Sequence, residues 1–159
     1  MDAKENLQKL ADFSFEIRKT TLKRLQEVPL GFMNWRLNTT ALSFAHIVQH
    51  LINVDDLFFS LTTSKEKQFQ WKLGSAEPHQ IVENLTYEVM IEKLKEYGQK
   101  RHTFISAFDA QRIDDKVVDE NGNEITFWWF IMRNVLEHEI YHRGQLAAYL
   151  KVIKGETSN

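Results

Sequence analysis

The chain has 159 residues, 43% of them hydrophobic, and its 20 basic and 22 acidic side chains leave a formal charge of −2. This length and apolar content suit one core, so we expect residues 1–159 to form a single domain. The nearly balanced charge provides no basic surface for a phosphate backbone, and nucleic acid is therefore not an expected partner.

Neither a membrane span nor a secretion signal is expected. No apolar run approaches the roughly 18 to 20 residues that cross a bilayer, and the first residues, MDAKENLQKL, lack the apolar core of a signal peptide. We therefore expect a cytoplasmic protein with no membrane partner. Because the chain has no cysteine, any metal must be held by histidine, carboxylate, amide or water.

Four segments carry apolar residues at the three- and four-residue spacing of a helix, and polar breaks separate them. The expected helices have the approximate bounds Lys4–Glu27, Thr39–Leu61, Thr86–Phe108 and Phe127–Lys154. In the second, Thr39 or Thr40 is expected as the N-cap. The buried stripe of the first is expected to contain Leu7, Leu10, Ala11, Ser14, Ile17, Thr21 and Leu25. The polar segment 64–80 is expected to be a long connection.

A small β-hairpin is expected before the last helix. Two short runs of alternating residues, DKVVD and EITFW, flank Asn121 and Gly122, which readily adopt the positive φ angles of a tight turn. The predicted fold class is therefore all-α, an up-down four-helix bundle with a small hairpin before the last helix. The long second connection also allows a different threading of the four helices.

The last helix contains the ten residues EHEIYHRGQL, in which His-Glu-x-x-His matches the helical signature of zinc peptidases. With about 100° of rotation per residue, His138 and His142 lie about 40° apart, in the same apolar stripe as Ile131 and Tyr149. Two neighbouring imidazoles are costly to bury without partners, and one divalent ion satisfies both. The alternative is a pair of core histidines, each satisfied by a buried hydrogen bond.

A third ligand has to come from upstream, because no histidine follows His142 and the remaining carboxylate, Glu156, lies in the C-terminal tail. The upstream histidines are His46, His50, His79 and His102. His79 lies in the polar connection and His102 follows two basic residues, so both are expected to be solvated or structural. His50 lies on the buried side of the second helix and is the expected third ligand, with His46 as a supporting or surface residue.

The strings FAHIVQHLINVDDLFF and HEIYHRGQLAAYL, with a tryptophan upstream in NWRLNTTALSFAH, resemble the DinB-like superfamily, also called the DinB/YfiT metalloenzymes. The resemblance covers essentially the whole chain, and its most specific part is HRGQL after a histidine four residues earlier. It implies an antiparallel four-helix bundle, frequent homodimers, and a divalent ion such as zinc or nickel held by His50, His138 and His142. Gly144 and Gln145 match the family's Gly-Gln, where a small residue permits close helix contact and a glutamine orients a ligand.

Three further features have structural interpretations that we favour over functional ones. Arg101 lies in the apolar arc of the third helix and is expected either to pair with a buried acid or to extend to solvent, rather than to bind an anionic substrate. Glu139, about 100° from His138, is expected to be solvated or paired on its own helix rather than to act as a general base. Trp128 and Trp129 are expected to pack in the core and hairpin rather than to form an aromatic substrate cage.

The expected function is that of a metal-dependent enzyme that uses a low-molecular-weight thiol with a small-molecule substrate, of the S-transferase or isomerase type. This follows from the resemblance, since some members of the superfamily are thiol-dependent transferases and isomerases. One alternative is a metal-dependent hydrolase. Another is a non-catalytic metal-binding stress-response protein. Three histidine ligands leave one tetrahedral position open, which favours catalysis, although no residue beyond the ligands is assigned a catalytic role.

Overall fold

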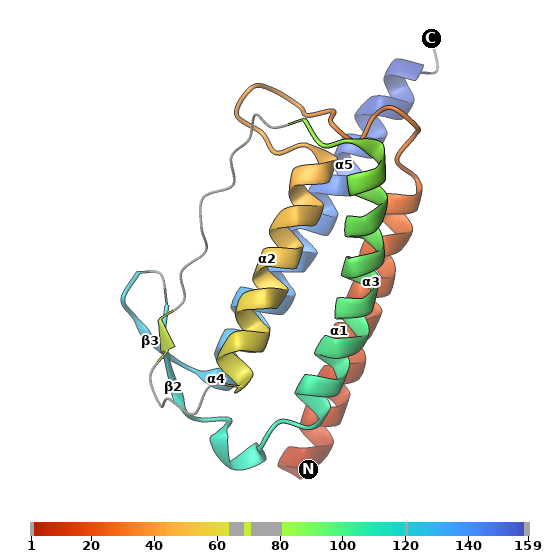
Figure 1. Cartoon of the computed structure of the whole chain (residues 1–159). Helices are drawn as coiled ribbons and strands as arrows, with labels where there is room; N and C mark the ends of the chain where they lie inside the picture. The colour runs from red at the N-terminus through yellow and green to blue at the C-terminus, as the bar shows by residue number, and fades with distance from the viewer. Residues whose placement is uncertain (1, 64–68, 71–80, 120, 158–159) are drawn as a thin grey trace.

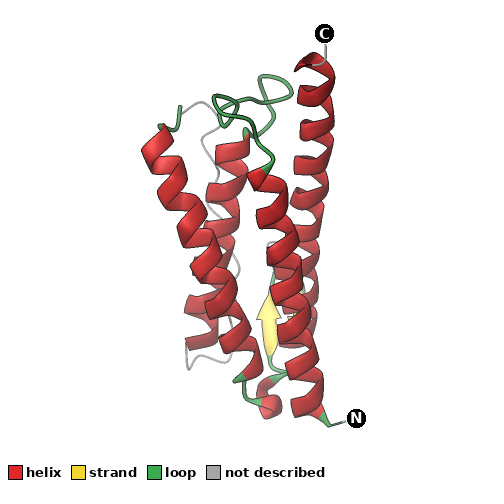
Figure 2. Cartoon of the chain, turned by 90° about the vertical axis from the view of Figure 1, so that its right-hand side faces the viewer, coloured by secondary structure: helices red, strands yellow, loops and turns green. Residues whose placement is uncertain are grey.

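The structure is a computed structural model that describes residues 2–63, 69–70, 81–119 and 121–157. His79 and most of the predicted connection 64–80 lie outside the described residues. The long helices are α1 (Ala3–Gln26), α2 (Phe44–Thr63), α3 (Asn84–Ser106) and α5 (His138–Thr157). They lie side by side in Figures 1 and 2, so the predicted four-helix bundle is confirmed. None of the described helices has the length and apolar content to cross a bilayer.

The helices are threaded so that α2 and α3 run in the same direction, while α1 and α5 run the opposite way (Figure 1). Residues further along α2 contact residues further along α3, as expected for two parallel helices. The Tyr97 hydroxyl donates to Asp56 at 2.6 Å, and further along both helices the rings of Phe59 and Phe104 lie 5.0 Å apart. The long second connection therefore joins two parallel helices, which is the alternative threading that its length allows.

The predicted start of α2 is wrong, because the helix begins at Phe44 rather than near Thr39 or Thr40. The side chain of Asn38 accepts hydrogen bonds from the backbone N–H groups of Thr40 and Ala41, which holds these residues in a local turn. Ser43 Oγ instead accepts the backbone N–H of His46 at 3.1 Å. The serine hydroxyl therefore performs the capping role expected of a threonine.

The predicted hairpin is present and consists of β2 (Lys116–Val118) and β3 (Glu124–Thr126), paired antiparallel. Its turn has Gly122 at φ +80°, a backbone conformation that costs glycine little. A two-residue strand that the sequence did not predict, β1 (Phe69–Gln70), pairs parallel to β2. The small sheet lies at the end of the bundle where α2 ends (Figure 1).

The last helical segment begins with α4 (Phe127–Phe130), continues through the π-helical segment η2 (Ile131–Glu137) and enters α5 without a break. The side chain of Thr126 accepts the backbone N–H of Trp129 and caps its start. The predicted helix from Phe127 onwards is therefore confirmed as one continuous helical run. Its π-helical turn lies directly before the first histidine of the last helix, and such turns frequently occur at functional sites.

The buried apolar side chains form two clusters along the bundle. One contains Leu7, Phe58, Ile105 and Phe130, and the other contains Leu25, Phe44, Leu94 and Leu146. The predicted stripe of α1 is confirmed, with Arg18 as an additional buried member. Each long helix carries one buried charged residue near the boundary between the two clusters in sequence: Arg18 on α1, Asp55 on α2, Arg101 on α3 and Glu139 on α5.

Candidate metal centre

Three histidines from two helices meet inside the bundle. His50 comes from α2, and His138 and His142 come from the first turns of α5. His138 Nε2 lies 3.0 Å from His50 Nε2 and 3.0 Å from His142 Nε2. One nitrogen of each ring lies within 4.8 Å of the other two, and among the described residues these histidines are the one group with such an arrangement of potential metal ligands.

The orientation of His142 is set by a chain of hydrogen bonds along α5. Its Nδ1 lies 3.0 Å from Gln145 Oε1, and Gln145 Nε2 donates to the Tyr149 hydroxyl at 3.0 Å. A carbonyl oxygen can only accept, so Nδ1 of His142 carries the proton and Nε2 keeps its lone pair for the centre of the triad. Tyr149 is itself packed edge-on against Trp35 and Phe44, at ring distances of 5.2 and 5.6 Å.

The triad is electrostatically suited to a cation. Burial lowers the pKa of both His50 and His138 to about 4, and the neighbouring imidazoles contribute in the same direction. Burial also lowers the pKa of His142. All three rings are therefore neutral near pH 7, which is the form that coordinates a metal.

The geometry of the triad fits one divalent ion. Zinc binds imidazole nitrogen at about 2.0 to 2.1 Å, which separates two tetrahedral ligand nitrogens by roughly 3.3 Å. The 3.0 Å contacts from His138 to His50 and His142 are close to that value. Three converging nitrogens without a cation would require one ring to donate to another, whereas an ion satisfies all three lone pairs.

The other predicted histidines do not join the triad. The Nδ1 atom of His46 lies 2.9 Å from Ser43 Oγ, at the start of α2. His102 lies 2.8 Å from a carboxylate oxygen of the exposed Asp12. His46 therefore contacts the residue that caps α2, and the contact of His102 agrees with a structural role.

Gly144 does not have the packing role that the sequence predicts. A Cβ atom added there would meet no atom within 4 Å, so a small residue is not required for close helix contact at this position. Trp129 is 48% exposed, while Trp128 packs against the core cluster that includes Phe130. The expected packing of Trp128 is confirmed, and Trp129 lies at the surface.

The expectation that Glu139 is solvated is wrong, because its side chain is only 1% exposed. Arg18 donates to Glu139 through Nε at 2.8 Å and Nη2 at 3.0 Å, and Arg101 Nη1 donates to it at 2.6 Å. Burial alone favours the neutral acid, but the two arginines outweigh it and hold the pKa of Glu139 below its usual range. The burial of Glu139 could have been predicted from helical periodicity, since Leu146 and Leu150 lie at about 80° and 120° from His138, on either side of Glu139 at about 100°.

Asp55 completes a buried group of two arginines and two acids, in which each long helix supplies one residue. Its carboxylate accepts from Arg18 at 2.7 Å and from Arg101 at 3.2 Å. The pairing of Arg101 with a buried acid is thus confirmed, while Arg18 and Asp55 were not predicted. The burial of Arg18 and Asp55 is indicated by their positions in the sequence, since both charged residues fall on the apolar face of their helices.

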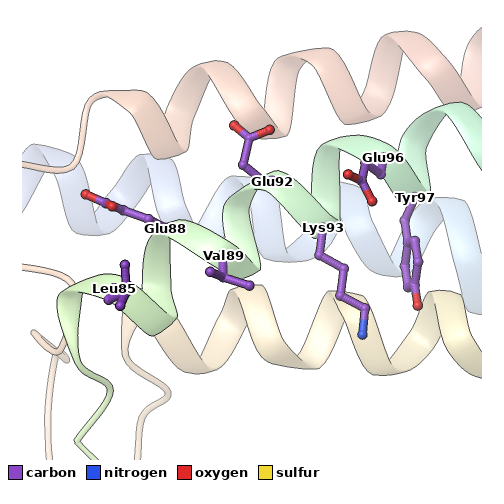
Figure 3. Close-up of a pocket in the computed structure, with 7 residues that line it drawn as sticks. All are labelled: Leu85, Glu88, Val89, Glu92, Lys93, Glu96 and Tyr97. Carbon is purple, nitrogen blue, oxygen red and sulfur yellow. The ribbon is translucent and has the colours of Figure 1, made fainter.

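A separate groove lies on the surface of α3 and has a volume of about 580 Å³ (Figure 3). Its lining residues are Leu85, Glu88, Val89, Glu92, Lys93, Glu96 and Tyr97. None of the three histidines lines it, so it is not a route to the triad.

Comparisons with known proteins agree with this architecture. The sequence model of the mycothiol-S-transferase family matches residues 9–154, which is most of the chain. The chain belongs to the mycothiol-S-transferase family. A search of curated protein sequences found no match.

The fold of this family member is similar to a crystal structure of a DinB-like protein, YjoA, from Bacillus subtilis. The two share 20% sequence identity, with 92% of each chain covered and a TM-score of 0.65. The predicted resemblance to the DinB-like superfamily is therefore confirmed by both the family match and the fold.

Proposed function

We propose that the chain is a metal-dependent thiol S-transferase whose divalent ion is held by His50, His138 and His142. The observation that supports this most strongly is the convergence of three neutral imidazole nitrogens, two pairs of them 3.0 Å apart. A divalent ion with an open coordination position lowers the pKa of a thiol that binds there and so favours the nucleophilic thiolate near neutral pH.

The proposed co-substrate is a low-molecular-weight thiol, and the family name supports mycothiol as that thiol. In the transfer, the thiol sulfur forms a bond to an electrophilic carbon of the second substrate, and the bond from that carbon to its leaving group breaks with its electron pair. The leaving group and the thiol proton are released to solvent. The chain has no cysteine, so the sulfur nucleophile has to come from the co-substrate. The second substrate is a small electrophile.

The chain's own residues prepare the triad for this chemistry. Gln145 keeps the His142 proton on Nδ1, and Tyr149 holds the glutamine in place. Burial keeps all three imidazoles neutral at physiological pH. These features support a site built to receive a cation.

The same geometry disfavours a hydrolase of the zinc-peptidase type. In that mechanism the glutamate of His-Glu-x-x-His acts as a general base. Here both carboxylate oxygens of Glu139 are bonded to arginine and its side chain is buried, so it cannot accept a proton from a water molecule at the triad. The metal-dependent hydrolase is therefore the weaker proposal.

The identity of the ion, the oligomeric state and the cellular location are proposals that rest on the resemblance to the superfamily. We propose zinc or nickel as the native ion, a homodimer as the assembled form, and the cytoplasm as the location. Elemental analysis of protein purified without added metal tests the first, and light scattering on an eluting size-exclusion peak tests the second. A manganese-only or monomeric result contradicts the corresponding proposal.

The proposed activity is tested by incubating metal-loaded protein with mycothiol or another small thiol and a panel of electrophiles. The His142→Ala variant, measured beside the wild type, serves as the matched control. Turnover that needs both thiol and His142 supports the transferase, and turnover without thiol on ester or peptide substrates supports the hydrolase. Stoichiometric metal binding without turnover on any substrate supports the non-catalytic alternative.

A further inference from the structure

Two arginines bridge the two helices that carry the histidines. Asp55 lies on α2 and Glu139 lies on α5. Both acids accept hydrogen bonds from the same two arginines, which therefore connect α2 to α5. Arg18 from α1 donates to Asp55 at 2.7 Å and to Glu139 at 2.8 Å. Arg101 from α3 donates to the same two acids at 3.2 and 2.6 Å. Helices without a histidine ligand therefore supply both arginines.

Stability alone does not explain this arrangement. Each of the four side chains is at most 1% exposed, so all four charges have lost their hydration. Apolar residues that replace such a buried network are often neutral or stabilising, because the desolvation cost disappears with the charges. What apolar residues do not provide is a fixed geometry, since the planar fork of arginine joins two carboxylates only in a narrow range of positions.

Gly98 on α3 provides the space in which Arg18 lies. A Cβ atom added to Gly98 would lie 2.6 Å from Arg18 Cγ and 3.3 Å from its Cβ. The guanidinium cannot easily move aside, because its Nη1 also donates to the backbone oxygen of Leu94 at 2.7 Å while its other nitrogens contact both acids. Both the stem and the head of Arg18 are therefore fixed.

We propose that Arg18 and Arg101 are positioning residues of the metal centre. By joining Asp55 to Glu139, they set the rotation and spacing of α2 and α5, and this brings His50 against the two histidines of α5. Glu139 directly follows His138, so the position of its carboxylate constrains the backbone that carries the ligand. The inference rests on the proposed function for the ion, but the relative positions of the three imidazoles can also be measured in metal-free protein, so the two can fail separately.

The test uses two variants that keep every charge. Gly98→Ala displaces Arg18, and Arg101→Lys keeps the cation but loses the fork. Gly155→Ala is the matched control, because it lies on α5 where an added Cβ atom meets nothing within 4 Å. Long-range ¹H–¹⁵N spectra of the imidazoles in metal-free protein report the contacts within the triad, and Co²⁺ titration followed by visible absorption reports ligand geometry and affinity. Circular dichroism confirms that each variant is folded.

Gly98→Ala and Arg101→Lys are expected to shift the imidazole signals and the Co²⁺ absorption bands and to lower Co²⁺ affinity by about tenfold or more. Gly155→Ala is expected to match the wild type. Unchanged imidazole and Co²⁺ spectra in a folded Gly98→Ala protein overturn the proposal, and Arg101→Lys decides in the same way if Gly98→Ala does not fold. A wild type that binds no Co²⁺ contradicts the proposed function, while the imidazole spectra still decide the positioning role.

Discussion

Arg18 donates to Glu139 from Nε at 2.8 Å, deep between the helices, although Glu139 directly follows His138 in a sequence that reads as a peptidase motif. The spacing of the two histidines has the same consequence here as in that motif, since it places both rings on one side of a helix. The intervening glutamate has a different role, because arginines occupy its carboxylate. The helical spacing therefore predicts a metal site, and the environment of Glu139 argues against peptidase chemistry.

Removal of any single ligand histidine is expected to abolish stoichiometric metal binding. His50→Ala, His138→Ala and His142→Ala each leave two imidazoles, which is too few for a stable site in this donor set. The measurement is metal content by elemental analysis after mild chelation and reloading. His46→Ala is the control, because its Nδ1 bonds to Ser43 and it lies outside the triad. Equal metal content in the wild type and all three ligand variants would contradict the assignment.

Gln145→Leu is expected to weaken metal binding by about tenfold to a hundredfold, as loss of a partner that orients a histidine ligand typically does. The variant removes the acceptor for Nδ1 of His142, so the ring loses its fixed tautomer and orientation. Isothermal titration with Zn²⁺ measures the change. Tyr149→Phe, which removes only the hydroxyl that Gln145 contacts, is expected to have a smaller effect in the same direction. An unchanged Zn²⁺ affinity in Gln145→Leu would show that the glutamine does not orient His142.

Glu139→Ala is expected to reduce the free energy of unfolding by about 3 to 5 kcal/mol, since it leaves two buried arginine charges with Asp55 as their remaining acid. The measurement is equilibrium unfolding in urea. Glu137→Ala is the matched control, because Glu137 pairs with Arg133 at the surface, where both side chains are more than half exposed. An exposed pair of this kind contributes less than about 1 kcal/mol. Equal losses in the two variants would show that Glu139 is not part of a buried network.

The stability of the metal-free protein is expected to fall with pH below about 6.5. Unfolded histidine has a pKa of about 6.5, whereas burial lowers the pKa of His50 and His138 to about 4 in the folded chain. Between these values the unfolded chain binds protons that the folded chain does not, so the free energy of unfolding decreases as the pH falls through this window. Below about pH 4 the contribution of these two groups is lost completely.

Urea unfolding of metal-free protein at several pH values between 7.5 and 4.5 measures this dependence. The double variant His50→Ala/His138→Ala is the control, because other acids also titrate in the lower part of the range. It is expected to show a shallower decrease than the wild type. Parallel pH profiles for the two proteins would contradict the contribution of His50 and His138 to this pH dependence.

The fold and the ligand set were predictable from the sequence because both depend on helical periodicity. His138 and His142 share a stripe with Ile131 and Tyr149. Ile131, His142 and Tyr149 are buried as expected, and His138 is half-buried. The hairpin was predictable from Asn121 and Gly122, because only a few residue types readily adopt the φ of +80° found at Gly122.

The buried charges were not predictable in the same way. Periodicity places Arg18 and Asp55 on apolar faces, but a charge there is acceptable only with a partner, and that partner lies on another helix. Which helix supplies it depends on the threading, and the long connection 64–80 is compatible with either direction of α3. The N-cap of α2 was missed because Asn38, Thr39, Thr40 and Ser43 all have side chains that cap helices, and local sequence does not rank them.

A crystal structure of metal-loaded protein, with data at the metal absorption edge, decides whether one divalent ion lies among His50, His138 and His142. We expect one anomalous peak per chain, about 2.0 to 2.1 Å from the Nε2 atom of each histidine, with one coordination position not filled by a protein side chain. A peak held by other residues, or no peak at the triad in protein that contains stoichiometric metal, would contradict this ligand set.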